Sequence, residues 1–137
     1  MEVKRDFKKQ GKLNRASGAR FELVVRKDLE ERGWIVDKWT NNIVDKKLVK
    51  VKNKWTGPGR PMMLGAGFPD FVAFRPCDSI NVKVIGVEAK INGYLKLEEK
   101  EKCKWYLDNH IFSRILIAKK TKQGRRIVVE YNEFNNK

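Results

Sequence analysis

Apolar residues recur at helical spacing in residues 18–32 of the chain. They stand three or four positions apart and so share one helix face: Phe21, Val24, Val25 and Leu29. Ser17 precedes this segment as a suitable N-cap, and Gly33 follows it as a suitable C-terminal stop. A second helical pattern covers residues 94–109. The sequence therefore predicts two helices, one early in the chain and one late.

Apolar runs that are typical of strands fill most of the remaining chain. They cover residues 34–39, 46–55, 69–74, 82–90, 113–120 and 125–131. The stretch 56–69 contains four glycines and three prolines, so we expect a loop or a series of turns there. This order of elements predicts an α/β fold, with a central mixed β-sheet that is flanked by helices.

The chain length of 137 residues fits a single domain that spans residues 1–137. Residues 1–14 are basic and contain few apolar positions, so we expect a flexible arm; residues 40–68 are a basic insertion rich in glycine and proline. The amino terminus lacks the apolar core of a secretory signal, and no apolar run is long enough to cross a membrane. We therefore expect a cytoplasmic, DNA-associated protein with no membrane partner.

The net charge of the chain is the feature that says most about its binding partner. Lys and Arg number 31 against 17 Asp and Glu, which gives a net charge of +14. Such an excess favours polyanions, because each neutralised phosphate releases bound counterions. Nucleic acid is the first candidate partner, with an acidic membrane surface and ribosomal RNA as alternatives. Cys77 and Cys103 form neither a disulfide framework nor a Cys/His metal motif, and we expect no small-molecule cofactor.

Two strand-like runs carry charged residues where strands usually carry apolar ones. Asp70 lies in "GFPDFVAFR", and Glu88 and Lys90 lie in "VIGVEAK". Residues two apart share a strand face, so Glu88 and Lys90 lie together, and pairing of the two strands brings Asp70 to the same end of the sheet. Pro69 fixes the position of Asp70, and Gly86 leaves room beside Glu88 for something to approach the backbone.

This constellation suits a divalent cation. Two carboxylates are the ligands that Mg²⁺ (or Mn²⁺) prefers, with water and phosphate oxygens completing the shell. A neighbouring lysine can orient or deprotonate the attacking water and neutralise charge that develops on phosphate. The alternative is that these residues form ordinary ion pairs at strand ends.

The same residues resemble the signature of the PD-(D/E)xK nucleases, with Asp70 as the motif aspartate and Glu88-Ala89-Lys90 as (D/E)xK. The segment "GARFELVVRKDLEERGW" resembles the opening helix of archaeal Holliday junction resolvases, in which a glutamate joins the metal site; Glu22 matches that position. The resemblance extends over roughly residues 17–119. Viral-type replication-repair nucleases are the alternative branch.

The resemblance implies a restriction-endonuclease-like core, Mg²⁺-dependent cleavage of DNA that leaves a 5′-phosphate, a branched substrate and a homodimer. It implies metal ligation by Asp70, Glu88, the Ala89 carbonyl and Glu22, with Lys90 positioning the water. The chain departs from the family in the long insertion 40–68, where resolvases have a short loop. It also departs at Glu99, where both branches tend to have glutamine.

Basic and aromatic residues in the first half of the chain are the predicted DNA-binding set. They are Arg15, Arg20, Lys46, Lys47, Lys50, Lys52, Lys54, Trp55 and Arg60. Lysine and arginine bind phosphates, and Trp39 and Trp55 can stack on splayed bases. A sheet edge that uses lysines against aggregation is the alternative. The sequence thus predicts a branched-DNA endonuclease; a flap, single-strand or restriction-type nuclease and a non-catalytic basic binding module remain open.

Overall fold

The computed structural model describes residues 6–55, 61–64, 67–77 and 80–135, with the backbone alone for 52–55 and 61–64. Helix α1 (Phe7–Glu31) begins much earlier than expected, since the Asp6 side chain caps it by accepting a hydrogen bond from the Lys9 amide at 3.1 Å. Residues 7–14 are therefore helical, and the prediction of a flexible arm is wrong for them. The lysines and glutamine there have high helix propensity, so they form a helix although no apolar residues recur at helical spacing.

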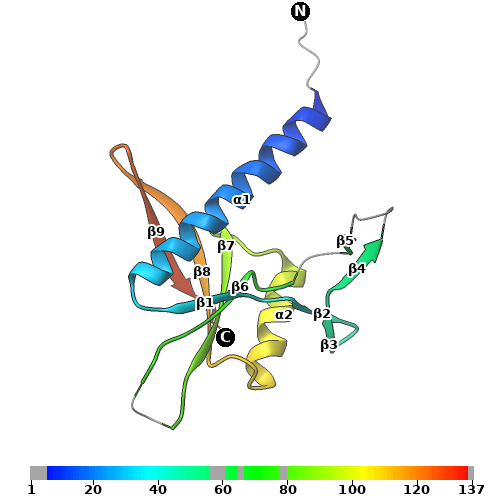
Figure 1. The fold of residues 1–137 in the computed structure, drawn as a ribbon, viewed down its shortest axis with the longest axis vertical. Coiled ribbons are helices and arrows are strands. Elements are labelled where there is room, and N and C mark those ends of the chain that lie inside the picture. The colour runs from blue at the N-terminus through cyan, green and yellow to red at the C-terminus, as the bar shows by residue number, and fades with distance from the viewer. Residues whose placement is uncertain (1–5, 56–60, 65–66, 78–79, 136–137) are drawn as a thin grey trace, which may run out of the picture.

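The main sheet has five strands in the order β1-β6-β7-β8-β9. These strands are β1 (Ile35–Lys38), β6 (Phe71–Phe74), β7 (Val84–Lys90), β8 (Arg114–Gln123) and β9 (Arg126–Glu133). Neighbours are antiparallel except β7 and β8, which are parallel and are connected through helix α2 (Leu97–Asp108). The predicted α/β architecture with a mixed sheet is confirmed (Figure 1).

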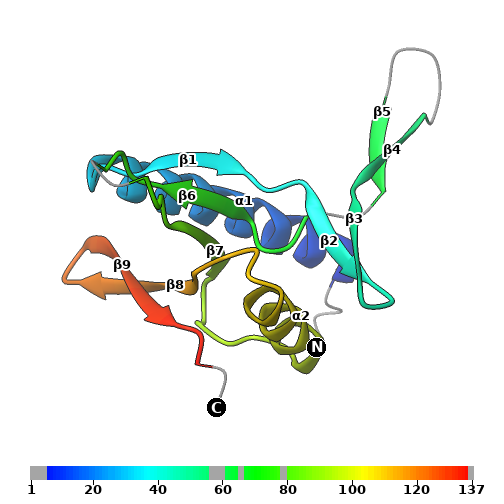
Figure 2. The same ribbon diagram turned by 90° about the horizontal axis from the view of Figure 1, so that it is seen from below.

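The two helices cover opposite faces of this sheet (Figure 2). Alternation along β8 shows the division, because Ala118 packs with α1 residues Phe21 and Val25 whereas Ile117 packs with Cys103 and Tyr106 of α2. The charged residues Glu88 and Lys90 alternate with Val87, which belongs to the α1 core. They therefore lie on the α2 face of β7.

The insertion 40–68 forms two small hairpins beside the main sheet (Figure 2). Strands β2 (Asn41–Val44) and β3 (Lys47–Lys50) pair through a turn at Asp45 and Lys46, and β4 (Lys52–Trp55) pairs with β5 (Pro61–Leu64). The prediction of one strand over 46–55 is wrong, because its two halves pair with different partners. The prediction of a continuous loop over 56–69 is wrong at β5. Its proline, Pro61, lacks a backbone N–H but takes the first position of the strand, where no hydrogen bond from that group to the neighbouring strand is needed.

Candidate active site

Asp70 and Glu88 meet where β6 and β7 are paired. The register places Phe71 opposite Val87, so one further step brings Asp70 opposite Glu88. The two side chains are hydrogen bonded, and Asp70 Oδ2 also accepts a hydrogen bond of 2.9 Å from the Ala89 amide. The structure thus brings together the two carboxylates that the sequence places at one end of the sheet.

Packing around Pro69 and Gly86 holds Asp70 in this position. A Cβ atom on Gly86 would lie 2.9 Å from Pro69 Cγ and 3.2 Å from the Phe112 ring. Pro69 is fully buried, and the Phe68 carbonyl before it accepts a hydrogen bond of 2.5 Å from the Tyr106 hydroxyl. The space expected beside Gly86 is therefore occupied by the protein's own side chains. The absence of a side chain at Gly86 lets Pro69, the residue before Asp70, pack against β7.

Glu88 is almost completely buried, with 5% of its surface exposed. Its Oε2 atom has no hydrogen-bond partner among the described residues. Burial, followed by the charge and hydrogen bond of Asp70, raises the pKa of Glu88 to about 10. With no cation beside it, Glu88 therefore carries a proton at neutral pH.

Glu22 extends from α1 to the same pair of carboxylates. It is partly buried and hydrogen bonded to Asp70, although α1 covers the opposite sheet face from Glu88. Burial and then the charge of Asp70 raise the pKa of Glu22, whereas Lys38 acts in the other direction. Glu22, Asp70 and Glu88 are called the carboxylate cluster below.

Lys90 is not free beside this cluster but is paired with Glu99 of α2. Lys90 Nζ lies 2.6 Å from Glu99 Oε2, and Glu99 Oε1 accepts a hydrogen bond of 2.9 Å from the Lys96 amide. Burial alone would lower the pKa of Lys90, but Glu99, Glu88 and Asp70 outweigh it and raise the pKa. Lys90 is therefore an ammonium at neutral pH, which favours donation to phosphate or water over removal of a proton.

Glu99 is the site residue that the sequence reasoning missed as a partner of Lys90. Burial acts to raise its pKa, but the bonds from Lys90 and the Lys96 amide prevail and lower it, so Glu99 is an anion. Its position was visible in the sequence as the departure from the family's glutamine. The pairing itself depends on where α2 packs against β7, which no local pattern reveals.

The carboxylate cluster fits a divalent cation by its chemistry, although it is not a preformed metal cage. Within the described ranges, no group of three or more His, Cys, Asp and Glu side chains is arranged to hold a metal. Instead, Asp70 is hydrogen bonded to both Glu22 and Glu88. The unpartnered Oε2 of Glu88 and the adjacent Asp70 are the donors that Mg²⁺ prefers. Of Ala89, the structure shows the amide bound to Asp70 and gives no ligand role to its carbonyl.

A cleft of about 770 Å³ opens beside the cluster, between α1 and the chain that follows β7. Its α1 wall includes Arg15, Gly18 and Glu22, and its other wall includes Lys90 and Lys96. Three cationic side chains thus surround the approach to the carboxylates. This placement suits a phosphate group at the cluster.

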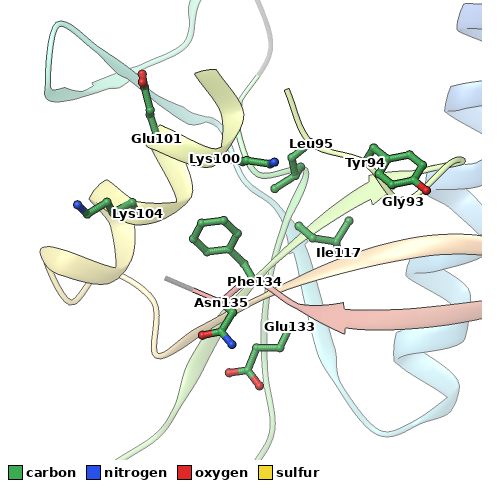
Figure 3. Close-up of a pocket in the computed structure, with 10 residues that line it drawn as sticks. All are labelled: Gly93, Tyr94, Leu95, Lys100, Glu101, Lys104, Ile117, Glu133, Phe134 and Asn135. Atoms are coloured by element: carbon green, nitrogen blue, oxygen red, sulfur yellow. The ribbon is translucent and has the colours of Figure 1, made fainter. Parts of the chain in front are cut away.

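A second pocket lies between α2 and the end of β9, away from the cluster (Figure 3). Figure 3 shows Phe134 extending between α2 and the sheet, with Leu95 and Ile117 nearby. The pocket contains none of the three cluster residues, and its acidic members are Glu101 and Glu133. It does not contribute to the chemistry described here.

The predicted DNA-binding residues fall into separate groups. Arg15 and Arg20 are exposed on α1, and Arg15 lines the cleft. The lysines at 46, 47 and 50 are exposed on the β2–β3 hairpin. The side chains at 52, 54, 55 and 60 lie outside the described residues. Trp39, for which a stacking role is predicted, is partly buried: its ring packs edge-on against Phe112 and its Nε1 donates to the Tyr106 hydroxyl at 3.1 Å.

Comparison of the chain with protein-family models, curated proteins and solved structures finds no match. Among the described residues, neither helix combines the length and apolar character needed to cross a membrane. The site therefore has to be interpreted from its own geometry.

Proposed function

We propose that the protein is a metal-dependent endodeoxyribonuclease that hydrolyses phosphodiester bonds, with a preference for branched DNA. The observation that supports this best is the buried Glu88, which has an unpartnered Oε2 and is hydrogen bonded to Asp70, in a cluster whose third member, Glu22, lines a cationic cleft. A buried carboxyl group that lacks a partner is costly to maintain unless a cation or substrate uses it. The proposal includes the restriction-endonuclease-like core that the PD-(D/E)xK resemblance implies.

Asp70 and Glu88 would hold Mg²⁺ or Mn²⁺, and Glu22, hydrogen bonded to Asp70, would support or complete the set. Such an ion supplies Lewis-acid polarisation of the phosphate and a more acidic bound water. A bound cation would oppose the rise in the pKa of Glu88, because it favours the charged form of the carboxyl group.

Lys90 acts on the substrate side of the cluster. Its ammonium, oriented by Glu99, donates hydrogen bonds to the attacking water and neutralises charge that develops on the phosphoryl oxygens. Water adds to phosphorus as the bond to the 3′ oxygen breaks, which leaves a 5′-phosphate and a 3′-hydroxyl. Arg15 and Lys96 in the cleft would hold neighbouring phosphates.

The test is incubation of four-way junction, flap, single-stranded and duplex DNA with the protein, with and without Mg²⁺ or Mn²⁺. Metal-dependent nicking of the junction is expected to be fastest, and Asp70→Asn should abolish it while DNA still binds. Glu31→Gln on the exposed end of α1 is the matched control and should cleave normally. Faster cleavage of another substrate would contradict the branched preference.

Binding without any metal-dependent product would leave the non-catalytic basic module as the better description. A homodimer forms part of the proposal, because a two-fold enzyme matches the symmetric nicking of a two-fold junction. Sedimentation of the protein alone and with a junction measures this. A monomer in both conditions would contradict the resolvase-like mode but not the nuclease chemistry.

A further inference from the structure

Charge is segregated along α1. From Phe7 to Phe21 the helix carries only basic charges: Lys8, Lys9, Lys12, Arg15 and Arg20. From Glu22 to Glu31 it carries four acidic and two basic residues. The basic residues of the second half are paired within the helix, as in Arg26–Glu30 and Lys27–Glu31, whereas those of the first half form none of the ion pairs among the described residues.

Three of the unpaired cations lie on the helix face of Glu22. At 100° per residue, Lys8, Lys12, Arg15 and Glu22 fall within a sector of about 80°. Along the axis, Arg15 precedes Glu22 by about 10 Å and Lys8 precedes it by about 21 Å, at 1.5 Å per residue. Lys8, Lys12 and Arg15 are called the basic stripe. It forms a line of positive charge that leads to the carboxylate cluster.

The basic stripe is continuous with the cleft and accessible. Arg15 and Glu22 both line the cleft, and all three stripe residues are exposed. The N-terminal turns of α1 extend beyond the edge of the main sheet (Figure 1). A long polyanion can therefore lie along this half of α1 while one of its phosphates reaches the cluster.

The stripe fits a nucleic acid backbone better than a lipid surface. A helix that lies on a membrane needs an apolar face opposite its basic one. The exposed apolar residues here are Phe7 and Leu13, which are about 120° apart around the helix and form no such face. One DNA strand rises 3.4 Å per nucleotide, so 21 Å of helix spans about six nucleotides.

We infer that the basic stripe of α1 binds the phosphate backbone of the DNA arm next to the scissile bond. Lys8, Lys12 and Arg15 contact successive phosphates and guide the strand into the cleft towards the carboxylate cluster. The inference rests on the proposed function for the position of the cut. The binding surface itself is defined by the charges on α1.

The experiment measures DNA affinity as a function of salt in EDTA, where no cleavage occurs. The stripe variant is Lys8→Gln/Lys12→Gln/Arg15→Gln, since glutamine keeps helix propensity. The matched control is Lys122→Gln/Arg125→Gln/Arg126→Gln, which removes the same charge from an exposed turn at the far end of β8 and β9. Affinity falls as salt rises, so the slope of log affinity against log salt is negative. The stripe variant should reduce the magnitude of this slope by about 2–3, and the control by less than 1.

An unchanged slope in the stripe variant, or an equal loss in both variants, overturns the inference. Binding to anionic vesicles is measured in parallel, and a stripe-dependent loss there without a loss on DNA overturns it as well. Cleavage in Mg²⁺ separates this result from the proposed function. If the stripe variant nicks DNA like the wild type and its salt slope is unchanged, only the inference about the basic stripe is rejected. If its slope is reduced but no protein nicks DNA, the wild type included, only the proposed nuclease function is rejected.

Discussion

Lys90 Nζ and Glu99 Oε2 lie 2.6 Å apart, and this ion pair joins β7 to α2 directly beside the carboxylate cluster. A glutamine at position 99 would accept a hydrogen bond from Lys90 but would supply no negative charge. The anion at this position therefore fixes the orientation of the Lys90 ammonium and helps to raise its pKa.

Glu99→Gln should lower the rate of Mg²⁺-dependent cleavage about tenfold or more, while the KM for DNA changes little. The reason is that residues which orient a catalytic group typically contribute factors of 10–100 without binding substrate. Steady-state kinetics on a junction substrate measures both constants. The control is Glu98→Gln, since Glu98 is exposed and pairs with Lys102 of the same helix. Equal losses in the two variants would contradict a specific role of Glu99.

Glu88 should make the metal-free protein less stable as pH rises. Its pKa is about 10 in the folded state and close to the ordinary 4.5 in the unfolded chain. Between these values the folded state binds more protons than the unfolded state, so the free energy of unfolding falls with pH. The largest possible slope is about 1.4 kcal/mol per pH unit.

Glu88→Gln imitates the protonated acid and should remove this slope. Thermal unfolding in EDTA from about pH 6 to about pH 9 should show the variant overtaking the wild type towards the alkaline end. Glu101→Gln, at an exposed carboxyl on α2, serves as the control and should follow the wild type. Parallel curves for wild type and Glu88→Gln would show that Glu88 is not held protonated.

Mg²⁺ should stabilise the folded protein through the carboxylate cluster. At 100 times its Kd, a ligand that binds only the folded state adds about 2.7 kcal/mol to the free energy of unfolding. Asp70→Asn should abolish this gain, since it removes one of the two carboxyl groups that are proposed to hold the cation. Differential scanning fluorimetry across a Mg²⁺ titration measures it, independently of activity. A Tm that rises equally in both proteins would place the cation elsewhere.

Gly86→Ala should destabilise the protein by about 1–3 kcal/mol, the usual cost of overpacking. The new methyl group would lie 2.9 Å from Pro69 Cγ and 3.2 Å from the Phe112 ring, and both neighbours are buried. Gly18→Ala is the matched control, because its added methyl would meet nothing within 4 Å. In the interior of α1 it should stabilise by about 0.5–1 kcal/mol. Urea unfolding of both variants measures the contrast.

The sequence by itself determined the five strands of the main sheet and the faces on which their side chains lie. Alternation in "VIGVEAK" already places Glu88 and Lys90 on one side of β7, because side chains of an extended chain must alternate. The same reasoning, with the proline before it, placed Asp70 at the matching end of β6. The mixed α/β class followed from the order of the periodic segments.

Tertiary structure decided which strands pair and which distant side chains contact one another. The start of α1 depends on the cap by Asp6, and the residues after it show no helical spacing of apolar positions. The division of 46–55 into two strands depends on which strand pairs with each half. Trp39 is partly buried through its contacts with Tyr106 and Phe112, and Lys90 meets Glu99 through the packing of α2. Local periodicity sets the direction of a side chain, but contacts between distant segments depend on how whole elements pack, and no short stretch of sequence contains that information.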